Sequence, residues 1–176
     1  DFLSGGGGAD TLRDGEGGDT LLGGDGDDLL DLTLAGTPDT MLANGGAGID
    51  TLRIAANAVL TTPALLRVGE TGNGTLEVGG TALVTFRGVE RLSAWTGTAA
   101  DTLIGGMGAD TLQGGHGNDV LRGGVGAMRL KAAPATTSRS AALGRIRWSA
   151  GRASICCAAM TAPTCSALSP ARGARS

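Results

Sequence analysis

The sequence predicts an all-β chain in which many short strands stack on one another through a repeated turn. Residues 5–31 are three tandem nine-residue units of the form Gly-Gly-x-Gly-x-Asp-x-Leu-x, the second opening with Asp14 instead of Gly. The 176 residues include 33 Gly but only 2 Phe, 2 Trp and no Tyr. This composition excludes a core of large aromatic side chains and favours a thin core made from many copies of one aliphatic residue.

The first repeat block is predicted to span residues 1–53. Its regular units place an acidic residue at the sixth position and leucine at the eighth. The spacing then loosens, because the next two acidic residues, Asp39 and Asp50, follow at intervals of eleven residues. Asp1 lies nine residues before Asp10, which suggests that the chain begins within a preceding unit and is a fragment of a longer protein. The residues at the two key positions are Asp10, Asp19 and Asp28, and Leu12, Leu21 and Leu30.

Residues 54–95 leave the repeat and are predicted to form a small β insertion. Residues 75–78 and 81–86 are rich in β-forming side chains, and Gly79-Gly80 separates them. Two glycines between two such runs are typical of a tight β-hairpin.

The second repeat block is predicted over residues 96–126. Its aspartates again lie nine residues apart, at Asp101, Asp110 and Asp119, and each is followed two residues later by leucine. A further unit begins at Gly123 as Gly-Gly-Val-Gly-Ala and then stops.

Residues 127–176 are predicted to be a disordered basic tail. They hold eight Lys or Arg and no acid, whereas residues 1–126 hold six Arg against all seventeen acids, a net charge of −11. The acidic part would repel nucleic acid and attract metal cations. A cysteine-based metal site at Cys156, Cys157 and Cys165 is a weaker alternative for the tail.

A change of reading frame is a second hypothesis for this tail. With permissible synonymous codons, the shifted frame from Ala127 onward reads Asp-Ala-Leu-Glu-Gly-Gly-Ala-Gly-Asn-Asp, which completes the unit begun at Gly123. Sequencing the DNA around codons 120–140 decides between a natural tail and a frameshift product.

The nine-residue spacing carries a chemical consequence. Six residues form a turn and three form a strand, so two units make a coil of eighteen residues and alternate units stack about 4.8 Å apart. Asp1 is then expected beside Asp19, and Asp10 and Asp101 each beside the aspartate eighteen residues later. Facing carboxylates repel unless a cation lies between them. Carboxylates together with backbone carbonyls are the oxygen ligands that Ca²⁺ prefers.

Residues 1–53 and 96–126 resemble the RTX, or hemolysin-type calcium-binding, repeat family. The resemblance implies a right-handed parallel β-roll, here as two short stacks, with Ca²⁺ between adjacent turns. It implies side-chain ligands from Asp1, Asp10, Asp19, Asp28, Asp50, Asp101, Asp110 and Asp119. It also implies backbone carbonyl ligands near Gly5, Gly7, Gly23, Asp25, Gly105, Met107, Gly114 and His116.

Other interpretations are weaker. A flexible glycine linker has no reason to repeat leucine at one position, and Asp25–Asp28 lacks the glycine and glutamate of an EF-hand. His116 is read as an exposed variable residue, and no catalytic motif or membrane-spanning run of apolar residues stands out. Each buried leucine contributes about 1.5–3 kcal/mol against about 1–2 kcal/mol per ordered backbone residue, so the chain is expected to be disordered without calcium.

The predicted function is therefore calcium binding by a non-enzymatic repeat module of a secreted, extracellular bacterial-type protein. The family resemblance implies the type I secretion machinery as a partner. Alternatively, the chain is the C-terminal repeat region of a secreted hydrolase or epimerase, or of an adhesin, whose functional domain lies elsewhere. A metalloprotease or lipase motif upstream of Asp1 would favour the enzyme, and further repeats would favour the adhesin.

Overall fold

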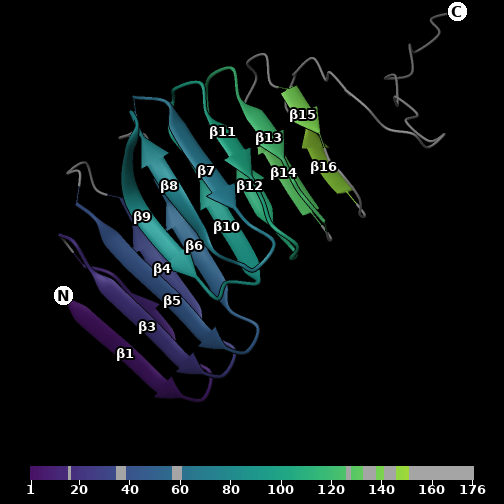
Figure 1. The fold of residues 1–176 in the computed structure, drawn as a ribbon. Helices are drawn as coiled ribbons and strands as arrows, with labels where there is room; N and C mark the ends of the chain where they lie inside the picture. The colour runs from purple at the N-terminus through teal and green to yellow at the C-terminus, as the bar shows by residue number, and fades with distance from the viewer. Residues whose placement is uncertain are drawn as a thin grey trace, which may run out of the picture.

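The protein is an all-β coil of two facing sheets, as seen in a computed structural model (Figure 1). The structure describes residues 1–15, 17–34, 39–56 and 61–125, together with the strands at 128–132, 138–140 and 146–150. This part of the chain contains sixteen strands and no helix, so the predicted all-β class is confirmed. No helix in it is therefore available to cross a membrane.

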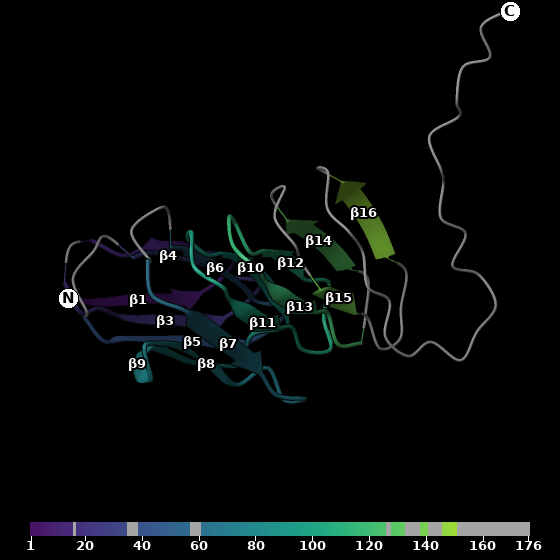
Figure 2. The same ribbon diagram turned by 90° about the horizontal axis from the view of Figure 1, so that it is seen from above.

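Sheet A has nine strands and sheet B has seven, and the two lie as layers one above the other (Figure 2). Neighbouring strands are parallel except where β8 pairs with its two neighbours. In spatial order sheet A consists of β1 (Phe2–Gly7), β3 (Thr20–Asp25), β5 (Met41–Ala47), β9 (Thr81–Arg87), β8 (Gly74–Val78), β7 (Ala64–Val68), β11 (Thr102–Ile104), β13 (Val120–Arg122) and β15 (Ser138–Ser140). Sheet B consists of β2 (Thr11–Arg13), β4 (Leu29–Thr33), β6 (Thr51–Ala55), β10 (Arg91–Trp95), β12 (Thr111–Gln113), β14 (Met128–Ala132) and β16 (Ile146–Ala150).

The chain alternates between the sheets, so consecutive repeat units lie in opposite layers and alternate units pair. Leu12 pairs with Leu30, and Leu103 pairs with Leu121, each eighteen residues further along. This is the register that the nine-residue period predicts for a parallel coil. The predicted β-roll class is therefore confirmed by the strand pairing.

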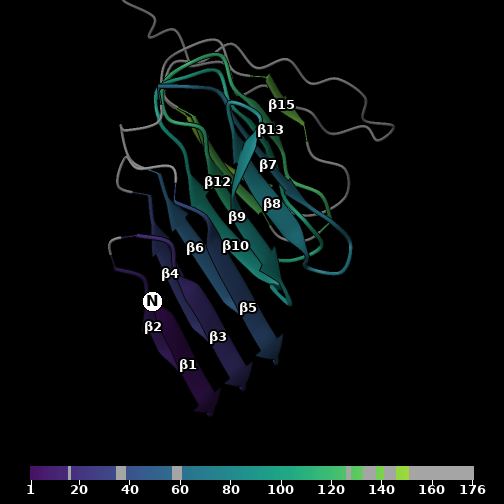
Figure 3. The same ribbon diagram turned by 60° about the vertical axis from the view of Figure 1, so that its left-hand side comes forward.

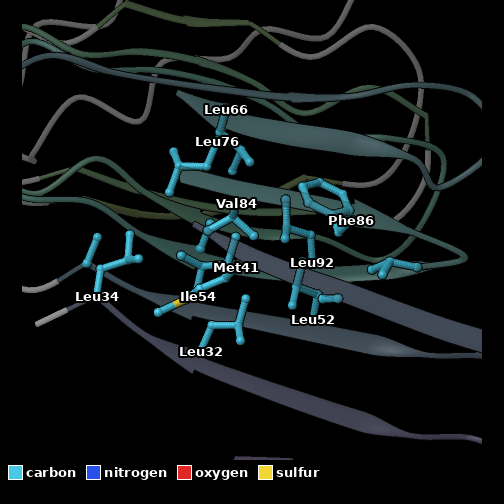
Figure 4. Packing of buried hydrophobic residues seen from close by; sticks show 14 of the residues in the cluster. Leu32, Leu34, Met41, Leu52, Ile54, Leu66, Leu76, Val84, Phe86 and Leu92 are labelled. Carbon is cyan, nitrogen blue, oxygen red and sulfur yellow. The ribbon is translucent and has the colours of Figure 1, made fainter. Parts of the chain in front are cut away.

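The core is the thin aliphatic layer between the sheets (Figure 4). The eighth-position leucines are almost all fully buried, because the middle residue of each short strand points inward. Phe86 is the one aromatic side chain of this core within the described residues. The fully buried leucines of the two blocks are Leu21, Leu30, Leu52, Leu103, Leu112 and Leu121.

The insertion is built into the roll rather than lying beside it (Figure 3). The predicted hairpin is present as β8 and β9, with Gly79 and Gly80 both at positive φ in its turn. Strands β9, β8 and β7 fill the space in sheet A between β5 and β11, whereas β6 and β10 pair directly in sheet B. Both sheets consequently run without a break from the first block into the second. The residue limits assigned to the blocks and the insertion stay a prediction.

Part of the predicted disordered tail differs from expectation. Residues 128–132 and 146–150 continue sheet B, and residues 138–140 continue sheet A. Strand pairing uses backbone groups, so an open parallel edge accepts the next segment even after the side-chain pattern has ended. The other residues of 126–176, including the three cysteines, lie outside the described residues.

Candidate metal sites in the turns

The acidic residues lie in the turns along the two edges of the roll. Asp10, Asp28, Asp50 and Asp110 lie on the edge where the chain passes from sheet A to sheet B. Asp19, Asp101 and Asp119 lie on the opposite edge. Asp50 is 0% exposed, and Asp101 and Asp119 are each 1% exposed. Burial of carboxylates at this level is rare unless they are paired or bind a metal.

One oxygen of most of these carboxylates accepts a backbone N–H from an earlier turn or strand of the same sheet edge. The backbone N–H of Asp10 donates to Asp28 Oδ1 at 2.8 Å, and that of Asp28 donates to Asp50 Oδ1 at 2.8 Å. On the other edge, the N–H of Asp101 donates to Asp119 Oδ1 at 3.1 Å. Asp10 and Asp28 therefore lie in adjacent turns, and so do Asp101 and Asp119, as the eighteen-residue spacing predicts. The Asp1 α-ammonium lies 2.7 Å from Asp19 Oδ1.

The second oxygen of six of these carboxylates is shielded from water and has no hydrogen-bond partner. An unsatisfied buried oxygen costs about 1–3 kcal/mol and more when it is charged, so six of them in one array call for a ligand. The six atoms are Oδ2 of Asp10, Asp28, Asp50, Asp101, Asp110 and Asp119.

Backbone carbonyl oxygens converge on the same small spaces. A Cβ atom built on Gly5 would lie 2.7 Å from Asp10 Oδ2 and 2.6 Å from the carbonyl oxygen of Gly23. On the second block, a Cβ on Gly105 would lie 2.6 Å from both Asp110 Oδ2 and the carbonyl oxygen of Gly123. Glycine is therefore required at these turns, because any side chain would fill the space in which a carboxylate and a carbonyl face each other.

The turns by themselves are an unfavourable environment for ionised carboxylates. Burial, followed by the charge of Asp101, raises the pKa of Asp119 to about 6. Burial is also the largest cause that raises the pKa of Asp101 and of Asp110. Since a pKa of about 6 leaves Asp119 ionised at neutral pH, the array carries uncompensated negative charge there.

The cations near the turns pair elsewhere. In the described residues, the ion pairs of side-chain cations are Arg53 Nε with Asp31 Oδ1 at 2.9 Å and Arg13 Nε with Asp31 Oδ2 at 3.7 Å. The same residues contain no group of three His, Cys, Asp or Glu side chains that could hold a metal alone. A metal in these turns would be bound by single carboxylates together with several carbonyls. This all-oxygen set suits Ca²⁺ and not Zn²⁺.

The predicted carbonyl donors lie at both exposed and buried positions of the turns. Gly7, Asp25, Met107 and His116 are exposed, while Gly105 and Gly114 are buried. The carbonyl of Asp25 accepts a hydrogen bond from Gly8 N–H at 2.7 Å. The assignment of all these residues as calcium ligands stays a prediction.

Two features were missed by the sequence reasoning. Glu90 accepts the backbone N–H of Asp50 at 2.8 Å and so continues the series of aspartates. The sequence contains a signal for this role of Glu90, since Glu90 precedes Leu92 by two residues, as each repeat aspartate precedes its leucine. The pairing of Asp31 with Arg13 and Arg53 was also missed, because it joins the ninth positions of three adjacent strands.

The fold and the turns together define a parallel β-roll of the calcium-binding kind. Its turns are lined by oxygen atoms, and glycine leaves the space between them open. The RTX calcium-binding nonapeptide repeat matches residues 1–32 and 95–127, in four copies. The resemblance of these two stretches to the RTX repeats is therefore confirmed, and that repeat is a structural calcium-binding module and not a catalytic one. No curated protein matches the chain.

Proposed function

We propose that this chain is a calcium-binding module whose folding depends on the ions between its turns. The observation that carries the proposal is the array of six buried carboxylate oxygens without a partner, several facing a backbone carbonyl. The proposed side-chain ligands are the predicted aspartates Asp10, Asp19, Asp28, Asp50, Asp101, Asp110 and Asp119, with Asp1 at the exposed end.

Calcium would supply the positive charge that the turns lack, and this chain's residues would do the rest. The Oδ1 atoms hold adjacent turns in register through backbone N–H groups, while the Oδ2 atoms and glycine carbonyls would hold the ion. A ligand at ten times its Kd adds about 1.4 kcal/mol per site, and stacked turns couple such contributions along the roll. Sites with Kd of about 10⁻⁴–10⁻³ M would respond to extracellular calcium.

Circular dichroism of the full chain during a calcium titration tests this function. We expect a coil spectrum in EGTA, a cooperative gain of β signal on adding Ca²⁺, and its reversal by EGTA. Mg²⁺ at the same concentration is the control, because its short octahedral coordination fits carbonyl-rich turns poorly. A coil spectrum that persists at about 10 mM Ca²⁺ would contradict the proposal.

The secreted setting is part of the same proposal. Repeats of this kind are typical of secreted bacterial proteins, and a chain that folds only in calcium-rich surroundings suits export in an unfolded state through type I secretion machinery. The parent protein would then be an exported hydrolase, epimerase or adhesin. The DNA upstream of Asp1 tests this setting, since a catalytic motif or further repeats would identify the kind of parent.

A further inference from the structure

The turn at residues 88–90 lies outside both stretches that match the repeat family, yet it imitates a repeat turn. It follows β9 of the insertion and leads into β10 of sheet B, as the repeat turns lead from one sheet to the other. Glu90 stands two residues before Leu92, which is 2% exposed in the core. Glu90 therefore occupies the position that aspartate holds in a regular unit.

The contacts of this turn repeat those of the aspartate series. Asp50 N–H donates to Glu90 Oε2 at 2.8 Å, and Arg91 N–H donates to the Asp50 carbonyl at 2.9 Å, as Thr51 N–H does to the Asp28 carbonyl at 2.8 Å. A Cβ on Gly45 would lie 2.5 Å from Asp50 Oδ2 and would collide with the carbonyl oxygen of Gly88. Asp50 Oδ2 and the Gly88 carbonyl thus face one small space, as Asp10 Oδ2 and the Gly23 carbonyl do.

This space lacks a positive charge. Asp50 is 0% exposed and its Oδ2 has no hydrogen-bond partner. In the described residues, neither acid takes part in an ion pair with a Lys or Arg side chain.

The series stops one turn later. Asp110 Oδ1 accepts the N–H of Leu92, not that of Glu90, at 2.9 Å. A cavity of about 280 Å³ lies between this turn and the turn at residues 106–110, and Val68, Val89 and Met107 are among its lining residues. The series of hydrogen-bonded acidic residues that begins in the first block therefore ends at the turn formed by residues 88–90.

We propose that the non-repeat turn at residues 88–90 completes an additional calcium site with Asp50. In this site Asp50 Oδ2 and the Gly88 carbonyl are ligands, and Glu90 is a positioning residue that holds the Asp50 backbone and adds negative charge. The ion fastens the insertion to the first repeat block, so that both sheets stay continuous. This inference rests on the proposed calcium-binding function.

Gly45→Ala in the full chain tests the site, with Gly69→Ala as its matched control. Neither glycine has a positive φ, and a Cβ on the exposed Gly69 makes only an ordinary contact with the Asn73 carbonyl oxygen at 3.4 Å, so only the first change fills the proposed site. Equilibrium dialysis with radioactive Ca²⁺ measures the number of bound ions, and trypsin probes the turn at the exposed Arg87 and Arg91 that flank it. We expect Gly45→Ala to bind one ion fewer than Gly69→Ala and to be cut at these arginines in calcium.

Glu90→Ala and Glu90→Gln separate the two roles of Glu90, with Glu77→Ala on β8 as the control. Glutamine keeps an oxygen that accepts Asp50 N–H, so we expect weaker binding of this ion in Glu90→Gln and its loss in Glu90→Ala. If Glu90→Ala binds as many ions as Glu77→Ala, the role of Glu90 is overturned.

Three outcomes of the Gly45→Ala comparison are distinguishable. A lost ion with cleavage at Arg87 and Arg91 supports the site. Equal stoichiometry and equal protection in Gly45→Ala and Gly69→Ala overturn it while the proposed function stands. If the unchanged chain binds no Ca²⁺ at all, the proposed function fails and this inference fails with it. Should Gly45→Ala fail to fold, the ion count of Glu90→Ala against Glu77→Ala decides.

Discussion

Replacement of Asp119 by asparagine is expected to move stability in opposite directions with and without calcium. Asparagine keeps an oxygen in the place of Oδ1, which accepts Asp101 N–H at 3.1 Å, and removes the charge of the unpartnered Oδ2. Without calcium this charge is destabilising, because the side chain is 1% exposed. With calcium it would be one of the proposed ligands. Asp119→Asn should therefore stabilise the metal-free roll and weaken its response to calcium.

The size of the effect follows from the pKa of Asp119. Burial raises this pKa to about 6 from the ordinary value of 3.8, with a smaller upward contribution from the negative charge of Asp101. The folded chain therefore holds the proton more tightly than the unfolded chain, so the free energy of unfolding falls as pH rises from about 4 to about 6. One pKa unit corresponds to about 1.4 kcal/mol, so the ionised side chain costs about 3 kcal/mol at pH 7. Asparagine should recover up to this amount.

Osmolyte-driven folding measures the effect without calcium. Trimethylamine N-oxide favours compact states, so a titration followed by circular dichroism at pH 7 in EGTA gives a folding midpoint for each chain. We expect a lower midpoint for Asp119→Asn than for the unchanged chain. Asp25→Asn, at an exposed position, makes the same change of charge and should leave the midpoint close to that of the unchanged chain. In a calcium titration, Asp119→Asn should need more Ca²⁺ to fold.

Two results would refute this reasoning. An unchanged or higher osmolyte midpoint for Asp119→Asn in EGTA would show that the charge of Asp119 does not destabilise the roll in the absence of calcium. An unchanged calcium midpoint would show that Asp119 is not a ligand. The two measurements are independent, so each tests one part of the argument.

Three further perturbations have defined outcomes. Gly105→Ala would place a Cβ 2.6 Å from Asp110 Oδ2, and should raise the calcium midpoint measured by circular dichroism. Gly69→Ala, whose Cβ would make only an ordinary contact at 3.4 Å, should leave this midpoint unchanged. Leu103→Ala, at a side chain that is 0% exposed, should lower the free energy of unfolding in calcium by about 2–5 kcal/mol in urea titrations. Lowering the pH from 7 to 5 should raise the calcium midpoint of the unchanged chain. The reason is that Asp119, with a pKa of about 6, then carries a proton that calcium must displace. An unchanged midpoint would contradict this prediction.

The repeat was predictable from sequence because its information is local. A period of nine residues with leucine at one position determines both the strand and the side of the strand that is buried. The pairing of Leu103 with Leu121 follows from that period alone. The hairpin of β8 and β9 was predictable for the same reason, since two glycines between β-forming runs specify a tight turn. The family match over residues 1–32 and 95–127 falls within these regular parts.

The insertion was less predictable because its placement depends on contacts between distant residues. Nothing in residues 54–95 indicates that β7 pairs with β11 while β9 pairs with β5. That order keeps both sheets continuous, because the outer strands of the insertion offer parallel edges to the two blocks. The sequence pattern had instead suggested two short stacks with a connector between them.

The nine-residue pattern alone specifies the parallel coil, its leucine core and the spacing that puts aspartates in adjacent turns. The packing of one turn against the next specifies which carboxylate oxygen accepts a hydrogen bond and which does not. Oδ1 of Asp28 and Asp119 binds a neighbouring N–H, and Oδ2 is left facing a shielded space. It also decided that Glu90 continues this series. The physical reason is that a period fixes which residues share a turn, whereas the direction of a side-chain oxygen depends on the turn packed against it.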